Sequence, residues 1–434
     1  MRSLKIYNVL ALIFFSVCSF AQSIPYVDLD LYKDRKCVRA SSDGVSSWLE
    51  GSWKSLVSSV NESVYTDNIN TDRFWGTLHT ALEDGTFYNR VAGMKFSDLE
   101  TGSDLFLKTV YLSINEVPVK YKSALPNGDT VTLSGKIFLP KKKEVKNIII
   151  ANHYTICSNQ EAPGYASSIE GIFATKDYIV LMPDYIGYGI SDTIPHPYLH
   201  LKSTVSAAID LLKAALPYLH ANCYVFSHSL YLVGYSQGAA ATLALQKELE
   251  ENYSYEYAIQ KVFAGAGPYD LAATFDFYLD HPFTDISCSL PMLIMGMNYG
   301  ENLGLKKEDF FQPFLLDAYP RLIESKTKMT SEVNAELGHD IKKLLKSIVF
   351  QKDTYPTSAL YNAVQKNSIV KWSPRNPLYL FHSTEDNMVP FLNSVHLRQE
   401  FESRQLKNVH YDFAPYGNHM NAAVTFFEKV YKSL

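Results

Sequence analysis

The chain has 434 residues, of which 47% are apolar, so it is long enough for one large domain with insertions or for two domains, and widespread disorder is excluded. The formal net charge is −5 without long runs of either sign, which argues against nucleic acid as the main partner. The 30 tyrosines and 24 phenylalanines suit a large core as well as pockets for apolar ligands, and composition alone does not choose between these uses.

The first 21 residues have the pattern of a cleaved signal peptide. Two basic residues precede an apolar run at 9–17, and Ser19 and Ala21 are small residues at the −3 and −1 positions before Gln22. The run is too short to span a bilayer. We therefore expect an exported chain that begins near Gln22 and has no stable membrane span.

Four cysteines remain after removal of that peptide, namely Cys37, Cys157, Cys223 and Cys288. They are widely spaced and form no C-x-x-C metal pattern. An exported chain can form disulfides, but four cysteines allow three pairings, and buried free thiols are equally compatible with the sequence.

The period of the apolar pattern changes after the first hundred residues. Residues 22–104 are helical or irregular in pattern and are predicted to form an N-terminal extension that packs on the main domain. Over 105–139 the period is two, and a Pro-Asn-Gly-Asp turn cluster at 126–129 separates two strand-like runs. This pattern predicts two antiparallel strands at the edge of a sheet.

Short apolar runs then alternate with segments of helical period. The runs, typical of strands buried on both faces, are at 145–151, 178–182, 230–233, 261–264 and 378–381, with a last strand candidate at 409–413. The helical segments are at 170–176, 203–218, 239–251, 392–403 and 421–432. This alternation predicts an α/β fold, with a mostly parallel sheet and helices on both faces.

One interval, at 268–373, is far longer than a simple crossover connection needs. Its helix-like stretches at 306–325 and 331–349 predict an inserted helical cap. The cap divides the α/β core into two parts, 105–267 and 374–434.

The strongest functional signal is Gly-Tyr-Ser-Gln-Gly at 234–238, between an apolar strand-like run and an alanine-rich helix start. In a strand–turn–helix context, Gly-x-Ser-x-Gly forms a strained turn that exposes the serine hydroxyl. Ser236 is therefore the predicted nucleophile. The backbone N–H of Gln237 is predicted to point at the oxyanion, at the positive end of the following helix.

A serine hydroxyl needs a base that removes its proton, and with this motif the chain order is serine, acid, histidine. His419, in a glycine-bearing loop between the last strand and the last helix, is the predicted base. Asp386 follows the strand at 378–381 and is the predicted acid that orients His419. Glu385 and Asp270, each after a strand, are the competing acids.

The loop Asn-His-Tyr-Thr at 152–155 is expected to supply the second oxyanion donor, through the backbone N–H of Tyr154 or Thr155. The alternative is that this loop only caps its strand. The glycines at 184–192 lack the third glycine and the Lys-Ser or Lys-Thr of a phosphate loop, and no His/Cys/Asp/Glu cluster has metal spacing. We expect no cofactor and no metal.

These motifs together resemble the secretory lipase family of the α/β-hydrolases, which includes the fungal lipase A type, and exported bacterial serine esterases. The resemblance rests on Pro-Asp-Tyr-Ile-Gly-Tyr-Gly-Ile-Ser at 183–191, His-Pro-Tyr-Leu at 196–199 and Val-Gly-Tyr-Ser-Gln-Gly-Ala-Ala-Ala at 233–241. It extends from about residue 117 to the C-terminus, although the cap matches only in position. It implies an α/β-hydrolase fold, a triad at Ser236, Asp386 and His419, a helical lid over an acyl pocket and no cofactor.

We therefore expect an exported serine hydrolase that cleaves small-molecule or lipid esters through an acyl-enzyme on Ser236. The Met-rich stretch at 288–299 in the cap either lines an acyl tunnel, contacts a lipid interface or packs on its neighbours. The alternative is a serine aminopeptidase of the same fold, in which Glu301, Glu308 and Asp309 bind a free amine. A non-catalytic binding protein is disfavoured because the triad residues occur complete and in order.

Overall fold

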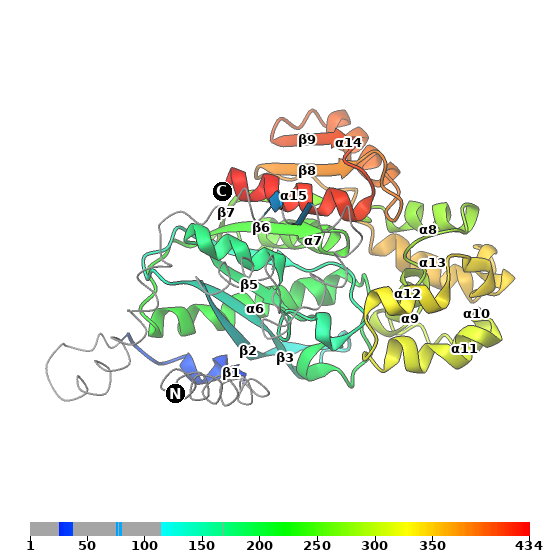
Figure 1. Cartoon of the computed structure of the whole chain (residues 1–434), viewed down its shortest axis with the longest axis horizontal. Helices are drawn as coiled ribbons and strands as arrows, with labels where there is room; N and C mark the ends of the chain where they lie inside the picture. Colours follow the sequence, from blue (N-terminus) through cyan, green and yellow to red (C-terminus); the bar gives the residue numbers. More distant parts are fainter. Residues whose placement is uncertain (1–25, 38–74, 77, 80–113, 167) are drawn as a thin grey trace, which may run out of the picture.

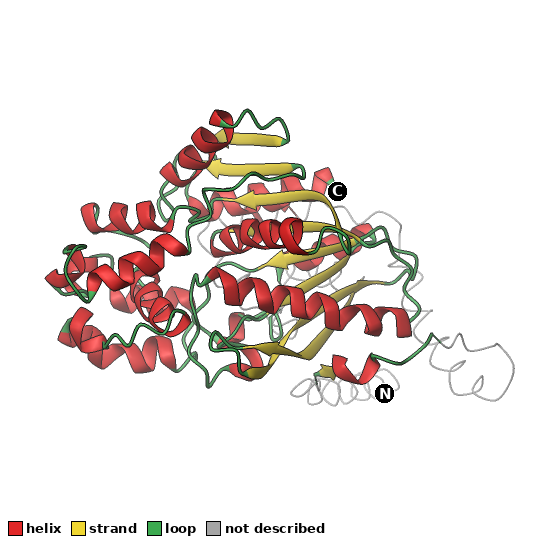
Figure 2. Cartoon of the chain, turned by 180° about the vertical axis from the view of Figure 1, so that it is seen from behind, coloured by secondary structure: helices red, strands yellow, loops and turns green. Residues whose placement is uncertain are grey.

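The computed structural model describes residues 26–37, 75–76, 78–79, 114–166 and 168–434. The expected signal peptide lies outside these residues, as does most of the expected N-terminal extension. The described chain forms one twisted sheet with helices on both faces, and a further group of helices lies beyond the tips of the strands (Figures 1 and 2).

The sheet in the described residues has nine strands, which in chain order are β1 (Val27–Asp28), β2 (Ile114–Ala124), β3 (Thr130–Pro140), β4 (Ile148–Asn152), β5 (Ile179–Pro183), β6 (Ser229–Tyr235), β7 (Ala258–Gly265), β8 (Leu378–Ser383) and β9 (Val409–Ala414). Their order across the sheet is β1-β2-β3-β5-β4-β6-β7-β8-β9. β3 is antiparallel to both neighbours, whereas every other pair is parallel. The mostly parallel sheet expected from the sequence is confirmed.

The local patterns explain the hairpin near one end of the sheet, where the short β1 lies outside β2, and the buried strands of its centre. The two strands expected within 105–139 form the antiparallel hairpin β2–β3, in which Ala124 pairs with Thr130 across the turn. Gly128 in this turn has a φ of 92°, which glycine adopts without a steric penalty. All residues of β4 and β5 are buried, so these strands show continuous apolar runs instead of alternation.

Helices cover both faces of the sheet (Figure 2). One apolar core contains α6 (Leu201–Ala221), α7 (Gln237–Asn252) and α14 (Leu392–Ser403), and the other contains α15 (His419–Ser433) and the 3-10 helix η4 (Ile169–Lys176). Successive residues of β4 alternate between the two cores: Ile148 and Ile150 belong to the first, and Ile149 and Ala151 to the second. The sheet is therefore buried between two helical layers.

The helices between β7 and β8 form a separate group beyond the carboxyl ends of the strands (Figure 1). We call this group the cap; its α-helices are α8 (Leu271–Asp280), α9 (Ser289–Gly300), α10 (Lys307–Phe310), α11 (Pro313–Tyr319), α12 (Thr330–Leu337) and α13 (Thr357–Lys366). None of the helices in the described ranges combines the length and the apolar character that a membrane span requires.

The cap helices are shorter than their patterns predicted. The stretch at 306–325 is divided into α10, α11 and a π-helical turn at Pro320–Glu324. The stretch at 331–349 is helical only to the end of α12, because Gly338 follows with a φ of 71°. A positive φ is not helical and glycine adopts it readily, so the helix ends here and two 3-10 turns replace the rest of the predicted helix.

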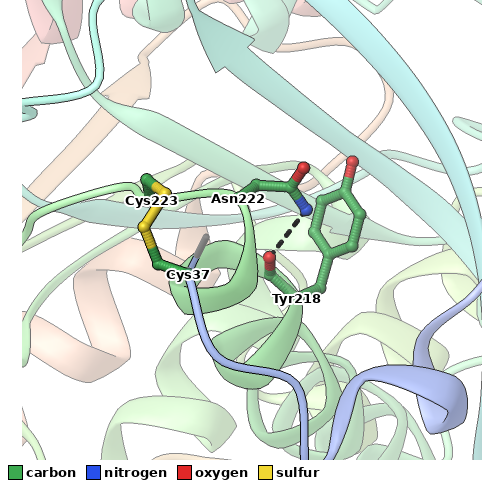
Figure 3. Close-up of a disulfide and its surroundings, with 4 residues drawn as sticks. All are labelled: Cys37, Tyr218, Asn222 and Cys223. Carbon is green, nitrogen blue, oxygen red and sulfur yellow. Dashed lines mark hydrogen bonds between the residues drawn. A yellow bond between two sulfur atoms is a disulfide. The ribbon is translucent and has the colours of Figure 1, made fainter. Parts of the chain in front are cut away.

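A disulfide joins Cys37 in the N-terminal segment to Cys223, just beyond the end of α6 (Figure 3). The end of that helix is also held by Asn222, whose side-chain amide donates to the carbonyl oxygen of Tyr218 (2.8 Å; Figure 3). The bond fits the oxidising compartment expected for an exported chain. The sequence left three ways to pair the four cysteines. The structure has the Cys37–Cys223 bond, and Cys157 and Cys288 are free and buried.

A buried carboxylic acid in η4 makes the stability of the fold sensitive to pH. Glu170 is 1% exposed, and apart from its own backbone amide no donor among the described residues binds either oxygen. Burial raises the pKa of Glu170 from its ordinary 4.5 to about 7, because an ionised carboxylate is poorly solvated there.

Glu170→Gln is expected to stabilise the protein at alkaline pH. Because the folded-state pKa lies above the unfolded one, the stability associated with neutral Glu170 is complete below about pH 4.5 and is lost as the pH rises through about 7. The full loss is roughly 3 kcal/mol. Urea unfolding should show a higher free energy of unfolding for the variant at pH 8 and little difference at pH 4.5. The exposed control Glu251→Gln should follow the wild type, and an equal effect of Glu170→Gln at both pH values would contradict this origin.

Candidate active site

Ser236 lies at the turn between β6 and α7. Its backbone has φ 56° and ψ −127°, a conformation that residues other than glycine rarely adopt. Its backbone N–H donates to the carbonyl oxygen of Gly265 in β7 (2.9 Å), which holds the turn. The flanking glycines are required by close packing: a Cβ at Gly234 would lie 2.1 Å from the oxygen of Gly238, and a Cβ at Gly238 would lie 1.9 Å from the oxygen of Asn152. The Gly-x-Ser-x-Gly pattern thus follows from the space that the turn leaves.

His419 is the first residue of α15, directly after the end of β9 and its loop. Its Nδ1 lies 2.6 Å from Oδ2 of Asp386, in the loop after β8, and both side chains are almost completely buried. Asn418 forms the N-cap of α15, and its side-chain oxygen accepts from two backbone amides of the first turn, which fixes where the helix begins. The structure therefore brings the predicted base and the predicted acid together.

Asp386 is held in its ionised form by its surroundings. Its Oδ1 accepts from the backbone N–H groups of Met388 (2.9 Å) and Val389 (2.8 Å), and Nε2 of His382 lies 3.4 Å from Oδ2. Burial by itself would raise the pKa of Asp386, but the positive charge of His419 and the hydrogen bonds from His382 and His419 outweigh it, so the pKa lies well below its ordinary value. The carboxylate is a fixed negative charge beneath the imidazole.

The competing acids are engaged elsewhere. Glu385 accepts from the backbone N–H of Gly417 (3.0 Å). Asp270 caps α8 through the N–H of Ala273 and lies 2.8 Å from Nδ1 of His396. Neither bonds to His419, so Asp386 is the acid that the geometry favours.

Ser236 and His419 line the same small cavity, of about 50 Å³, which we call the His419 cavity. Its walls come from the loop after β4, from α15 and from the cap, and include Tyr154, Met420 and Phe427. Within the described residues no hydrogen bond joins the Ser236 hydroxyl to the imidazole. Such bonds are often long without substrate and shorten in the reacting complex, so the arrangement is compatible with proton transfer.

A second cavity, of about 40 Å³, is also lined by Ser236, and we call it the Gln237 cavity. Thr155, Ile286 and Met388 line both cavities. His419 does not line the Gln237 cavity. Its apolar walls come mainly from α8 and α9 of the cap, with Leu271, Phe275 and Leu293. The Met-rich stretch predicted at 288–299 thus forms α9, whose leucines face the Gln237 cavity.

The two predicted oxyanion donors lie close to Ser236. Gln237 is the first residue of α7, so its backbone N–H has no acceptor within the helix. The loop at 152–155 packs directly on the start of α7, as the close approach of Asn152 to Gly238 demonstrates, and Tyr154 and Thr155 line the His419 cavity. Within this loop, the ring of His153 stacks on Tyr185 (ring centroids 4.0 Å apart), and burial lowers the pKa of His153 to about 4.

Sequence patterns missed two residues that position His419. The hydroxyl of Tyr235 donates to the carbonyl oxygen of His419 (2.8 Å), and the Asn387 side-chain oxygen accepts from the His419 backbone N–H (3.1 Å). Both stand next to predicted triad residues, and that adjacency was the available signal. The described residues contain no group of three or more His, Cys, Asp or Glu side chains that could hold a metal ion.

The family model described as secretory lipase matches residues 169–427, which is more than half of the chain. The chain belongs to the secretory lipase family. None of the curated proteins matches the sequence. Membership in the secretory lipase family supports hydrolysis of carboxylic esters as the class of reaction.

Solved structures share the fold of this secretory lipase family member. A protein from Legionella pneumophila is similar with a TM-score of 0.68 and 21% identity, over 74% of this chain and 88% of that one. The rice cell wall degrading esterase LipA from Xanthomonas oryzae has a TM-score of 0.65 and 22% identity over the same shares. Candida antarctica lipase A has a TM-score of 0.55 and 14% identity, over 70% and 73%. These likenesses establish the α/β-hydrolase fold expected from the sequence.

Proposed function

We propose that the chain is an exported serine esterase that cleaves carboxylic esters through an acyl-enzyme on Ser236. The observation that carries the proposal is that Ser236, on its strained turn, lines one cavity with His419, whose Nδ1 is bound to Asp386. Export is supported by the signal-peptide pattern before Gln22 and by membership in a family described as secretory.

In the proposed mechanism, Nε2 of His419 removes the proton of Ser236 while Oγ attacks the ester carbonyl carbon. The backbone N–H groups of Gln237 and Tyr154 stabilise the negative oxygen of the tetrahedral intermediate. His419 then protonates the departing alcohol, and water activated by His419 releases the acid. Asp386 keeps Nδ1 of His419 protonated and stabilises the imidazolium.

The two cavities suggest where the two parts of the ester bind. His419 has to protonate the leaving alcohol, so the alcohol oxygen lies on the side of the His419 cavity. The acyl group then occupies the Gln237 cavity, which His419 does not line. About 40 Å³ of space holds about three or four groups the size of a water molecule, so a short acyl chain fits and a long one does not.

Short acyl chains are therefore expected to be the better substrates. With soluble p-nitrophenyl esters, kcat/KM should be highest between acetyl and hexanoyl and at least about tenfold lower for dodecanoyl, because a longer chain meets the walls formed by α8 and α9. Initial rates at a fixed alcohol part test this directly. A kcat/KM that rises steadily to the palmitoyl ester would contradict the placement of the acyl group and favour a long-chain lipase.

The aminopeptidase alternative loses the residues that favoured it. Glu301 lies 3.3 Å from Nε2 of His200, is paired with Lys366, and lines a separate groove of about 990 Å³ between cap and core. Glu308 and Asp309 lie in α10 and line neither cavity beside Ser236.

One carboxylate does line the His419 cavity. Glu161 is buried there, but its Oε2 already accepts from the backbone N–H groups of Cys157, Ser158 and Thr330. It fastens the loop after β4 to the start of α12, and we assign it no role in binding a free amine. Turnover of aminoacyl-naphthylamides at rates comparable to those of esters would restore the aminopeptidase.

A further inference from the structure

The side chain of Gln237 is buried without a hydrogen-bond partner. Gln237 is 2% exposed, and neither its amide nitrogen nor its amide oxygen makes a hydrogen bond within the described residues. A buried amide that can donate twice and accept twice is costly to leave unpaired, so such groups usually have a partner in the working state of a protein.

Gln237 is one of the residues that line the proposed acyl site. Gln237 lines the Gln237 cavity together with Ser236 and with Pro268 and Leu271, which follow β7. Tyr154, which lines the His419 cavity, does not line this one. Gln237 therefore lies beside the space assigned to the acyl chain, and its backbone N–H is the proposed donor to the carbonyl oxygen.

The hydroxyl side chains in the same wall already have partners. Thr155 and Tyr198 bond to each other (2.8 Å), and Thr274 donates to the carbonyl oxygen of Asp270 (2.9 Å). Ser289 donates to the carbonyl oxygen of Ile286 (2.8 Å), and Tyr278 donates to that of Met388. Apart from the nucleophile Ser236, Gln237 is therefore the polar residue lining this cavity whose side chain has both an unused donor and an unused acceptor.

We propose that the Gln237 amide is a specificity-determining group that binds a hydroxyl on the acyl chain, so that the enzyme prefers hydroxyacyl esters to plain alkanoyl esters. The inference rests on the proposed function. Because Gln237 follows Ser236 directly in the chain and lines the same cavity, we place this hydroxyl near the carbonyl carbon of the acyl group. A hydroxyl supplies a donor for the amide oxygen and an acceptor for the amide nitrogen. A site built to bind a hydroxyl discriminates strongly against an analogue that lacks it.

A matched pair of esters tests this preference. The p-nitrophenyl esters of 3-hydroxybutanoic and 3-methylbutanoic acid differ only by the exchange of a hydroxyl for a methyl group of similar size. For the wild type, kcat/KM is expected to be at least about tenfold higher for the hydroxy ester. In Gln237→Met, which has a similar shape but no amide, the ratio is expected to fall to about one or below. The ratio is taken within each variant, so any general change in rate at this position cancels.

Leu293→Met is the control, because it alters the same wall and keeps the amide; its ratio should stay close to that of the wild type. A wild-type ratio near or below one overturns the inference, as does a preference that persists in Gln237→Met. Turnover of the acetyl ester but of neither member of the pair overturns the placement of acyl groups in this cavity. Failure to hydrolyse any ester, acetyl included, counts against the proposed function itself. This outcome differs from one in which acetyl is cleaved but the hydroxyl preference is absent.

Discussion

Ser236→Ala will lower kcat for p-nitrophenyl acetate by a factor on the order of 10⁴ or more. The hydroxyl at this position is the proposed attacking group, and alanine leaves only the oxyanion donors and substrate binding to accelerate hydrolysis by water. The turn itself should persist, because the backbone bond of residue 236 to the oxygen of Gly265 does not involve the side chain. Steady-state kinetics with purified protein measures the effect, and circular dichroism verifies the fold.

The matched control is Ser403→Ala, at the exposed end of α14, far along the chain from the turn that carries Ser236. It should keep kcat within about twofold of the wild type. Wild-type-like turnover in Ser236→Ala would remove Ser236 as the nucleophile and with it the acyl-enzyme mechanism. A loss shared equally by both variants would point to instability of the preparation instead of chemistry.

Asp386→Asn is expected to reduce kcat by about 10³- to 10⁴-fold. An amide cannot stabilise the imidazolium of His419 as a carboxylate does, and it favours the wrong tautomer of the imidazole. The fold should tolerate the change because the amide oxygen can still accept from the backbone N–H groups of Met388 and Val389. Since the pKa of Asp386 lies well below its ordinary value, the wild-type carboxylate is ionised at any pH used for the assay, and the deficit should appear across pH 6–9.

Glu385→Gln is the matched control for the acid, one residue earlier in the same loop. Glu385 bonds to the backbone of Gly417 and not to His419, so kcat should change by less than about threefold. The opposite result, a large loss in Glu385→Gln and a small one in Asp386→Asn, would transfer the role of the acid to Glu385. The two variants together decide between neighbours that sequence alone left in competition.

Much of the fold was predictable because its signals are local. The hairpin β2–β3 was marked by its period of two and its turn cluster, and α14 has the predicted bounds 392–403. The cap was harder, since helix propensity over 331–349 did not reveal that Gly338 would end the helix. Where the backbone is set by one residue in a left-handed conformation, a pattern averaged over a window does not locate the break.

The predicted site residues also divide into those that a local sequence pattern reveals and those that it does not. Gly-x-Ser-x-Gly was recognisable because its glycines answer a local steric need, and the order of Ser236, Asp386 and His419 follows from the order of the strands that carry them. Which of the two adjacent acids reaches His419 depends on the direction of side chains in one loop. The contact of Tyr235 with His419 crosses 184 residues of sequence, and no short-range pattern encodes it.

The amino-acid sequence by itself determined the alternation of strands and helices, the serine at the turn between β6 and α7, and the candidate base and acids, because each depends on neighbours in the chain. Only the tertiary structure decided the pairing of Cys37 with Cys223, the two cavities that meet at Ser236 and the burial of the Gln237 amide without a hydrogen-bond partner. Each of these features depends on segments far apart in sequence, whose packing is fixed by shape and polar complementarity that no single segment contains.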